Sequence, residues 1–163
     1  MDKNEVLNKI VEAFSGVVLG NGIGLWEAQA IDDYESKKEQ RKVRENDEKE
    51  NWKLIPPDIL QRCHSSLSFF NADGMRFYLS AFIIGSLENE VDDPIFHLTQ
   101  LDNYAKAKLT TLNDAQRQAI IMYLKWCLEQ DEYDFDFDHP VIRRALNEYW
   151  EKKSNKKSIA TAK

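Results

Sequence analysis

The chain has 163 residues, of which 42% are apolar and 31% are charged, and its formal net charge is −6 at pH 7. This length predicts one domain whose core buries roughly two-thirds of the unfolded surface. The last twelve residues hold five lysines and no acid, so residues 1–151 carry a formal charge of −11. Such an acidic body repels nucleic acid and anionic membrane surfaces, and it attracts a basic protein; acidity that serves only solubility is the alternative.

Nothing in the sequence indicates secretion, membrane insertion or a disulfide framework. Residues 1–14 carry charges throughout an amphipathic pattern, which argues against a signal peptide. No apolar run approaches the ~20 residues of a membrane helix. Cys63 and Cys127 are too few and too isolated for a disulfide framework or a metal-binding pair, so we expect two reduced core residues. These observations predict a soluble cytoplasmic protein.

The first helix is predicted over residues 3–14, where the apolar side chains form one stripe. Residues 16–24 contain four glycines but follow a helix and lack the GxxxxGK[ST] pattern, so they predict a connector rather than a phosphate-binding loop. Residues 25–51 begin amphipathic and become densely charged, which predicts an exposed helix or a helix that breaks near Ser36.

The predicted core lies in the middle of the chain. Pro57 can occupy the first position of a helix that runs to residue 69 or 70. A polar break at residues 71–74 then opens a helix over residues 75–87 that is apolar on almost every side. A helix with this composition lies inside a domain, so we expect the other helices to pack around it.

Three more helical segments are predicted after a polar turn at residues 88–94. They cover residues 95–109, a stretch from the N-cap signal at Thr111–Asp114 to Gln130, and a last helix that begins at Asp138 or His139 with Pro140 in its first turn. The sequence thus predicts a single all-α domain of about six helices over residues 1–151. A disordered basic tail is expected over residues 152–163, because it has almost nothing to bury.

The acidic segment before the last helix is the candidate partner-binding surface. It consists of Glu132, Tyr133, Asp134, Phe135, Asp136, Phe137 and Asp138. The spacing of Asp134, Asp136 and Asp138 is that of a calcium loop, but His139 and Ala145 stand where such a loop requires glycine and glutamate. Its rings can fill pockets in a partner while its carboxylates pair with cations. The alternative is a connector whose phenylalanines pack into the core.

No motif in the sequence points to catalysis or to a bound metal. His64, His97 and His139 are scattered and fit neither HxxxH nor HExxH. The serines at 65, 66 and 68 lack a GxSxG elbow. We therefore predict no catalytic residue, no metal site and no cofactor.

Arg76 is the one charged residue inside the predicted central helix, between Met75 and Phe77. A covered guanidinium needs an acid or several carbonyl groups. The nearest candidates are Asp32 and Asp33, at the end of the apolar stripe of the second helix. We predict a structural ion pair between Arg76 and one of them; a ligand-binding arginine and an exposed one are the alternatives.

Several blocks of the sequence resemble a small bacterial family of unknown function. They are residues 25–34 (LWEAQAIDDY), Arg44, Asp47, Trp52, residues 67–82 (LSFFNADGMRFYLSAF) and residues 145–150 (ALNEYW). The corresponding family patterns are LxEAxxIDDY, FLDxEGxRFYLPA and ALxxYW, and the resemblance spans about residues 5–150. Asn71 stands where an aspartate is usual, and Ser80 stands where a proline would kink the helix. The resemblance implies a shared fold, with no catalytic residue and no assigned activity.

Two classes of function fit these observations. The first is a non-enzymatic protein-binding domain, of the kind found in immunity proteins or antitoxins, that binds a basic partner such as a toxin. The second is an enzyme, a hydrolase or a metal-dependent one, whose site is assembled from scattered Asp, Glu and His residues. The small size, the acidic body and the aromatic–acidic segment favour the first. The sequence leaves the oligomeric state, the partner and any small ligand open.

Overall fold

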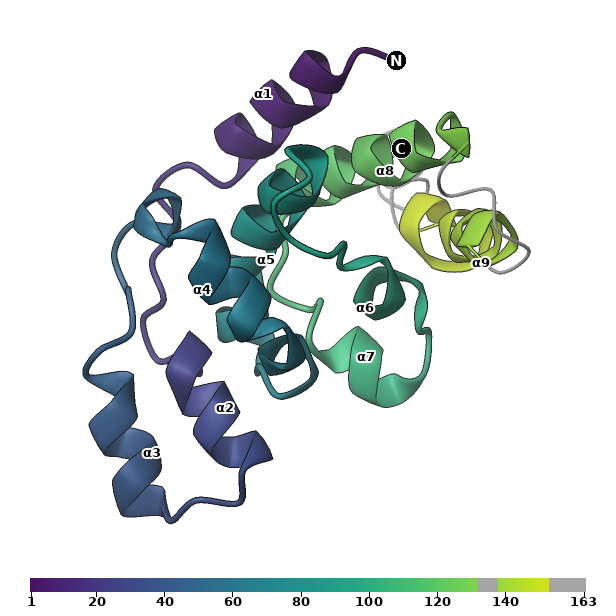
Figure 1. Ribbon diagram of the computed structural model, residues 1–163. Helices are drawn as coiled ribbons and strands as arrows, with labels where there is room; N and C mark the ends of the chain where they lie inside the picture. Colours follow the sequence, from purple (N-terminus) through teal and green to yellow (C-terminus); the bar gives the residue numbers. More distant parts are fainter. Residues whose placement is uncertain (132–137, 153–163) are drawn as a thin grey trace, which may run out of the picture.

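The apolar segment in the middle of the chain is α5, the helix Ala72–Leu87, and it lies at the centre of the molecule (Figure 1). Asn71 is its N-cap, and the Oδ1 atom of Asn71 accepts a hydrogen bond from the Gly74 N–H at 3.0 Å. Twelve of its sixteen residues are buried. The helix is continuous through Ser80, as expected where serine replaces a proline. The prediction of a buried central helix is confirmed.

The computed structural model describes residues 1–131 and 138–152 of the chain. Within these ranges it is a single all-α domain without strands, as the sequence predicts. The other helices are α1 (Lys3–Ala13), α2 (Leu25–Asp32), α3 (Lys37–Arg44), η1 (Trp52–Leu54), α4 (Pro57–Arg62), η2 (His64–Ser68), α6 (Ile95–Thr99), α7 (Asn103–Ala107), α8 (Asp114–Leu128), α9 (Asp138–Ala145) and η4 (Leu146–Trp150), the last a π-helix.

The helices around α5 form two groups. On one side α1, α4 and η1 pack against α5, and α1 also packs along α8. On the other side α9 and η4 pack against α8, and α6 packs against α9. Large aromatic side chains join elements within each group, and their polar atoms find backbone partners. Trp52 Nε1 donates to the Phe14 carbonyl and Trp150 Nε1 donates to the Leu98 carbonyl, both at 2.9 Å.

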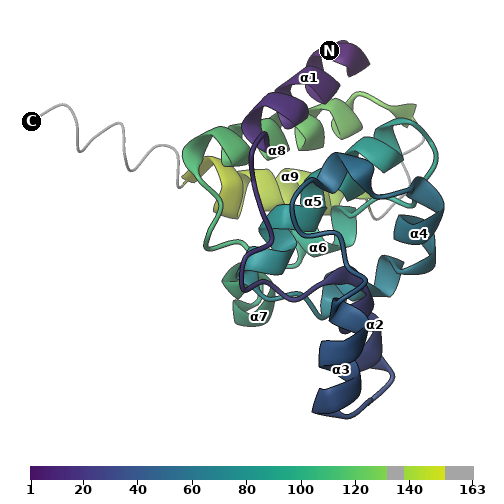
Figure 2. The ribbon, with the colours of Figure 1, turned by 90° about the vertical axis from the view of Figure 1, so that its left-hand side faces the viewer.

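Helices α2 and α3 form a hairpin that projects from the rest of the domain. Figures 1 and 2 both show this hairpin at the end of the molecule away from α1. Helix α3 packs on α2, and α2 in turn packs on η2. The charged run breaks where the sequence offers a new N-cap, because the Ser36 Oγ atom accepts from the Glu39 N–H at 3.2 Å. Of the two expectations for residues 25–51, the break near Ser36 is confirmed.

Two of the predicted helices are shorter than expected. The helix expected from Pro57 to residue 69 or 70 ends at Arg62 and continues as the 3-10 helix η2. Here the Ser66 hydroxyl donates to the Leu25 carbonyl at 2.8 Å, so the segment is shaped by its contact with α2. The segment over residues 95–109 divides into α6 and α7, because Asp102 caps a new helix by accepting from the Ala105 N–H at 2.7 Å.

Other expectations concern exposure and the chain end. Cys63 and Cys127 are buried free cysteines, as predicted. No helix in the described ranges is both long and apolar enough to cross a membrane. The predicted disordered tail, apart from Lys152, lies outside the described residues, so that prediction stays open.

Candidate functional site

A groove lies between α1, η1, α4 and α5, and we call it the α5 groove. Its volume is about 270 Å³. The apolar part of its lining consists mainly of Val11, Trp52, Ile55, Leu60, Ala81 and Ile84. Lys53 and Glu90, both exposed, are the charged residues of its lining. The groove is therefore an apolar depression with charges only at its edge.

The shape of the α5 groove depends on a close contact between α5 and the loop that follows it. A Cβ atom at Gly85 would lie 2.5 Å from Cγ2 of Val91, which is closer than real Cβ contacts. Val91 can therefore pack directly on α5 only because position 85 lacks a side chain. This contact places Glu90, the residue before Val91, beside the groove.

The same loop, residues 88–94, is held on α4 by paired hydrogen bonds. Gln61 Nε2 donates to Asp92 Oδ2 at 2.7 Å, and the Asp92 N–H donates back to Gln61 Oε1 at 2.7 Å. His64 Nε2 lies 3.1 Å from the Asp92 carbonyl oxygen and 3.3 Å from that of Asp93. The loop is thus a fixed part of the surface.

A second, more polar cavity of about 550 Å³ adjoins the α5 groove, and Glu90 belongs to both. Asp92 and Asp93 also line this acidic cavity. Burial raises the pKa of Asp93, and the nearby Asp138 carboxylate raises it further. Neither Glu90 nor Asp92 forms an ion pair with a described residue. These carboxylates are available to a cationic partner.

The predicted partner-binding segment falls almost wholly outside the described residues. Only Asp138 is described, as the first residue of α9, while Glu132 to Phe137 are not. Asp138 lies close enough to Asp93 to raise its pKa, so the described end of the segment is near one residue of the acidic cavity. The binding role of the segment stays a prediction.

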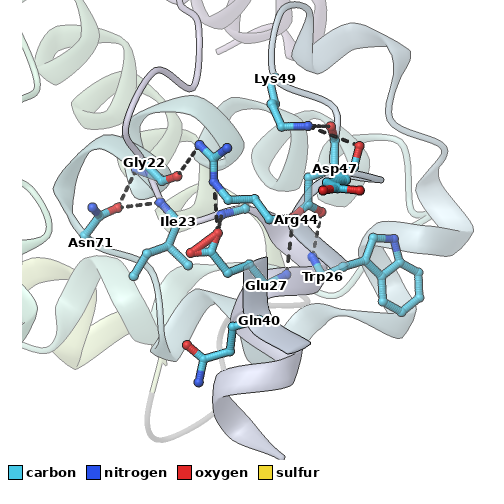
Figure 3. A network of polar contacts seen from close by, with 12 residues as sticks. Gly22, Ile23, Trp26, Glu27, Gln40, Arg44, Asp47, Lys49 and Asn71 are labelled. Carbon is cyan, nitrogen blue, oxygen red and sulfur yellow. Dashed lines mark hydrogen bonds and ion pairs between the residues drawn. The ribbon is translucent and has the colours of Figure 1, made fainter. Parts of the chain in front are cut away.

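A network of polar contacts fixes the α2–α3 hairpin to the domain (Figure 3). Gly24 is the N-cap residue of α2 and has no side chain to cap the helix. Asp47, more than twenty residues later, supplies the cap instead: its Oδ1 accepts from the Trp26 N–H at 2.7 Å, and its Oδ2 accepts from the Glu27 N–H at 3.2 Å. The end of the hairpin is thereby tied to its beginning.

Arg44, the last residue of α3, makes the second connection in this network. Its Nε atom lies 2.9 Å from Glu27 Oε2. Its Nη2 atom donates to the carbonyls of Gly20 and Gly22 at 2.8 and 3.0 Å. Asn71 completes the attachment, because its Oδ1 also accepts from the Ile23 N–H at 2.9 Å. The glycine-rich segment is therefore a connector clamped by Arg44 and Asn71, in agreement with the prediction.

The buried carboxyl of Asp47 makes stability depend on pH. Burial raises its pKa to about 6, although the two backbone N–H donors lower it. An unfolded aspartate has a pKa of about 3.9, so the folded state binds this proton more tightly. The contribution of Asp47 is full below pH 4 and is lost as the pH rises through 6. We expect the free energy of unfolding of wild type, measured relative to that of Asp47→Asn, to fall by about 2–3 kcal/mol between pH 4 and pH 7.

Urea unfolding of both proteins at several pH values measures this difference. Asp47→Asn is the control for wild type, because asparagine does not titrate. A difference that stays constant from pH 4 to 7, or that grows in favour of wild type, would contradict the assignment.

The structure corrects the expected ion pair of Arg76. Its Nη2 atom lies 3.8 Å from Oδ1 of Asp73, one turn earlier on the same helix, rather than near Asp32 or Asp33. Asp32 Oδ2 instead accepts from the Ser65 hydroxyl at 3.0 Å, and Asp33 is the exposed C-cap of α2. The prediction is wrong because the i,i+3 spacing already brings a carboxylate to Arg76.

The three histidines make different contacts. His64 contacts the loop at residues 88–94, and His139 Nε2 lies 3.3 Å from the Cys127 carbonyl oxygen. His97 borders a small cavity with Lys108, and burial lowers its pKa to about 4, so it is neutral at pH 7. In the part of the chain that the structure describes, no three His, Cys, Asp or Glu side chains are grouped to hold a metal.

Lys108 is a buried cation that the sequence did not single out. Its Nζ atom donates to the carbonyls of Leu67 and Ser68 and lies 4.3 Å from the centroid of the Tyr104 ring. Burial lowers its pKa to about 8. The cavity beside it has a volume of only about 110 Å³. Because two backbone carbonyls and a ring face satisfy the ammonium, these contacts explain Lys108 as a structural residue.

A comparison with protein families gives a match over almost the whole chain. A model described as a family of unknown function, DUF6714, matches residues 2–154. The chain belongs to this family. No match was found among curated proteins or among solved structures. Membership agrees with the resemblance inferred from the sequence. Because the function of the family is unknown, membership assigns no activity to the chain.

Several of the residues that carry the resemblance lie together in one part of the fold. Glu27, Arg44 and Asp47 are the network that mounts the α2–α3 hairpin, and Asn71 joins it from α5 (Figure 3). Asn71 uses a side-chain oxygen as its acceptor, which an aspartate also offers, so this departure from the family pattern leaves the contact possible. These residues of the pattern thus attach the hairpin to the domain, whereas residues 145–150 belong to α9 and η4, which pack on α8.

Proposed function

We propose that this protein is a non-enzymatic binding protein and that the α5 groove, with its acidic edge, receives a basic segment of a protein partner. The observation that carries the proposal is an apolar depression of about 270 Å³ beside two carboxylates, Glu90 and Asp92, that form no ion pair with a described residue. Apolar side chains of the partner would fill the depression. Lysine or arginine side chains next to them would reach Glu90 and Asp92.

Charge and shape give this surface different roles in binding. Complementary charges raise the association rate, and their effect falls as salt is added. Buried apolar anchors mainly slow dissociation. Because Gly85 and Gln61 fix the loop that carries Glu90 and Asp92, the acidic edge is ordered before the partner arrives. An immunity protein or antitoxin that blocks a basic toxin fits this description, and we propose it as the biological class.

The proposal is tested with a fluorescein-labelled amphipathic peptide of lysine and leucine, and fluorescence anisotropy measures its binding. We expect wild type to bind it at low salt and more weakly as salt rises. The double variant E90K/D92N should bind at least five-fold more weakly, since it removes the acidic edge while asparagine still offers an acceptor to Gln61. Ile84→Ala should speed dissociation.

The matched control is E45K/E148Q, which changes the net charge equally at two exposed positions outside the groove. We expect its affinity to stay within two-fold of wild type. Equal losses in the control and in E90K/D92N would mean that only overall charge matters, and the proposal would be wrong. Circular dichroism melting curves confirm that each variant is folded before binding is compared.

A further inference from the structure

The tip of the α2–α3 hairpin carries a residue in an unusual backbone conformation. Helix α2 ends in a Schellman motif: the Glu35 N–H donates to the Ala30 carbonyl at 2.9 Å, and the Tyr34 N–H donates to the Ile31 carbonyl at 3.1 Å. The residue at the centre of this turn has a left-handed conformation and is usually glycine. Here it is Tyr34, with φ at 57°.

The side chain of Tyr34 contributes almost nothing to the packing of the domain, because 96% of the residue is exposed. Helix α5 ends in the same kind of turn, with the Glu90 N–H bonded to the Gly85 carbonyl at 2.9 Å. There the left-handed residue is Asn89, with φ at 59°, and asparagine adopts this conformation with little strain. A strained and exposed tyrosine is therefore not required to end a helix in this fold.

Next to Tyr34, one face of α3 is strongly basic. Lys37, Lys38, Arg41 and Lys42 are all exposed and follow one another at helical spacing. Gln40, on the opposite face, is buried and donates through Nε2 to the Glu35 carbonyl at 2.9 Å. The helix thus exposes four cations along one side, of which Lys37 also donates through Nζ to Gln40 Oε1 at 3.2 Å.

The hairpin that carries Tyr34 and these cations is held rigidly at its base. Asp47 and Arg44 connect the beginning of α2 to the end of α3, as Figure 3 shows. The tip itself projects away from the domain (Figure 2). A projecting, pre-ordered element with an aromatic tip has the geometry of a docking element, because little freedom is lost on binding.

We infer that Tyr34 and the basic face of α3 form a second interaction surface, separate from the α5 groove, which docks onto an acidic segment of a protein partner. The ring of Tyr34 enters an apolar pocket, and the four cations pair with carboxylates around it. Tyrosine and arginine are enriched among the residues that dominate protein interfaces.

A protein segment fits this surface better than nucleic acid does. The eight residues of α3 span about 12 Å, so its cations face only a short stretch of charge. Glu39 pairs with Lys42 at 3.7 Å and so reduces the positive charge of the face. The acidic remainder of the chain repels a long polyanion. A short acidic segment can contact α3 without approaching that remainder, so it avoids the repulsion.

The test measures anisotropy with two labelled probes of similar charge, a sixteen-residue peptide of glutamate and leucine and the oligonucleotide dT10. We expect the peptide to bind wild type more tightly than dT10 does at the same salt concentration. K38E/R41E should weaken peptide binding at least ten-fold and flatten its salt dependence. Tyr34→Gly should weaken it at least five-fold with the salt dependence unchanged.

The matched control is R143E/R144E, which makes the same change in charge on exposed residues of α9. Its affinity for the peptide should stay within two-fold of wild type. Tighter binding of dT10 than of the peptide would overturn the inference. Equal losses in R143E/R144E and K38E/R41E, or undiminished binding by Tyr34→Gly, would also overturn it. Since none of these residues lines the α5 groove, failure here leaves the proposed function standing.

Stability gives a second measurement on the same variant. Glycine adopts the left-handed conformation without strain, so Tyr34→Gly should melt at the wild-type temperature or about 2–4 °C above it. Asn89→Gly is the comparison, and we expect it to change the Tm less. A Tm of Tyr34→Gly several degrees below that of wild type would show that the ring stabilises the fold, and the ring would then need no partner to explain it.

Discussion

Replacing Gly24 by alanine should lower the free energy of unfolding by about 3 kcal/mol. A Cβ atom at this position would collide with Oδ2 of Asp47 and would lie 2.6 Å from its Cγ. The backbone is not the cause, because Gly24 has a φ of −75° that any residue adopts. Alanine must instead push Asp47 away from the N–H groups of Trp26 and Glu27, which leaves α2 uncapped.

Urea unfolding of Gly24→Ala, Asp47→Ala and the double variant checks this explanation. If the carboxylate is the obstacle, Gly24→Ala should destabilise the Asp47→Ala background by only about 1 kcal/mol. Additive effects in the double variant would place the clash elsewhere, and a stable Gly24→Ala protein would contradict the contact itself.

Replacing Arg44 by methionine should lower the free energy of unfolding by about 2–3 kcal/mol. The change removes the partner of Glu27, whose side chain is only 17% exposed, and leaves it an unpaired carboxylate. It also removes the donor to the carbonyls of Gly20 and Gly22. Methionine keeps the aliphatic length of the side chain, so loss of packing contributes little.

The double variant E27Q/R44M is the control for the Arg44 prediction. Glutamine removes the unpaired charge, so we expect it to recover about 1 kcal/mol relative to Arg44→Met alone. A double variant less stable than Arg44→Met would show that Glu27 stabilises the hairpin without Arg44, and the network would need another explanation.

The features that local sequence determines were predictable. An apolar helix of sixteen residues after a capping asparagine can be buried on all sides only at the centre of a small domain, and α5 lies there. The N-cap signal at Thr111–Asp114 contains the cap, which is Asn113, two residues after Thr111; its Oδ1 accepts from the Gln116 N–H at 2.9 Å. Ser36, near which a break was one of the two expectations, caps α3. In each case the determining contacts lie within three or four residues of one another.

The features that depend on distant contacts were not predictable from the pattern. Asp47 caps a helix that begins more than twenty residues earlier, and no local spacing indicates such a pair. The reverse error occurred at Arg76, for which we expected a distant acid although Asp73 lay one turn away. The α5 groove forms only where α1, η1, α4, α5 and the loop at residues 88–94 meet, and two residues that shape it, Gly85 and Glu90, look ordinary in the sequence.

Tyr34 shows where sequence and structure together say more than either alone. In the sequence Tyr34 is one aromatic residue before a charged run. That charged run by itself indicates a solvated helix. The left-handed φ of Tyr34 and its exposure of 96% become visible only in the fold. A signal did exist, because tyrosine occupies the position after a helix end where glycine or asparagine is usual.

The most direct test of the central claim, that the α5 groove receives a basic partner segment, is a titration of ¹⁵N-labelled protein with the lysine–leucine peptide, followed by amide chemical shifts. We predict that the largest shifts cluster at Ile84, Gly85, Glu90 and Val91, around the groove and its acidic edge. They should disappear in E90K/D92N and persist in E45K/E148Q. Shifts of equal size spread over all acidic surfaces, with none concentrated at these four residues, would contradict the claim.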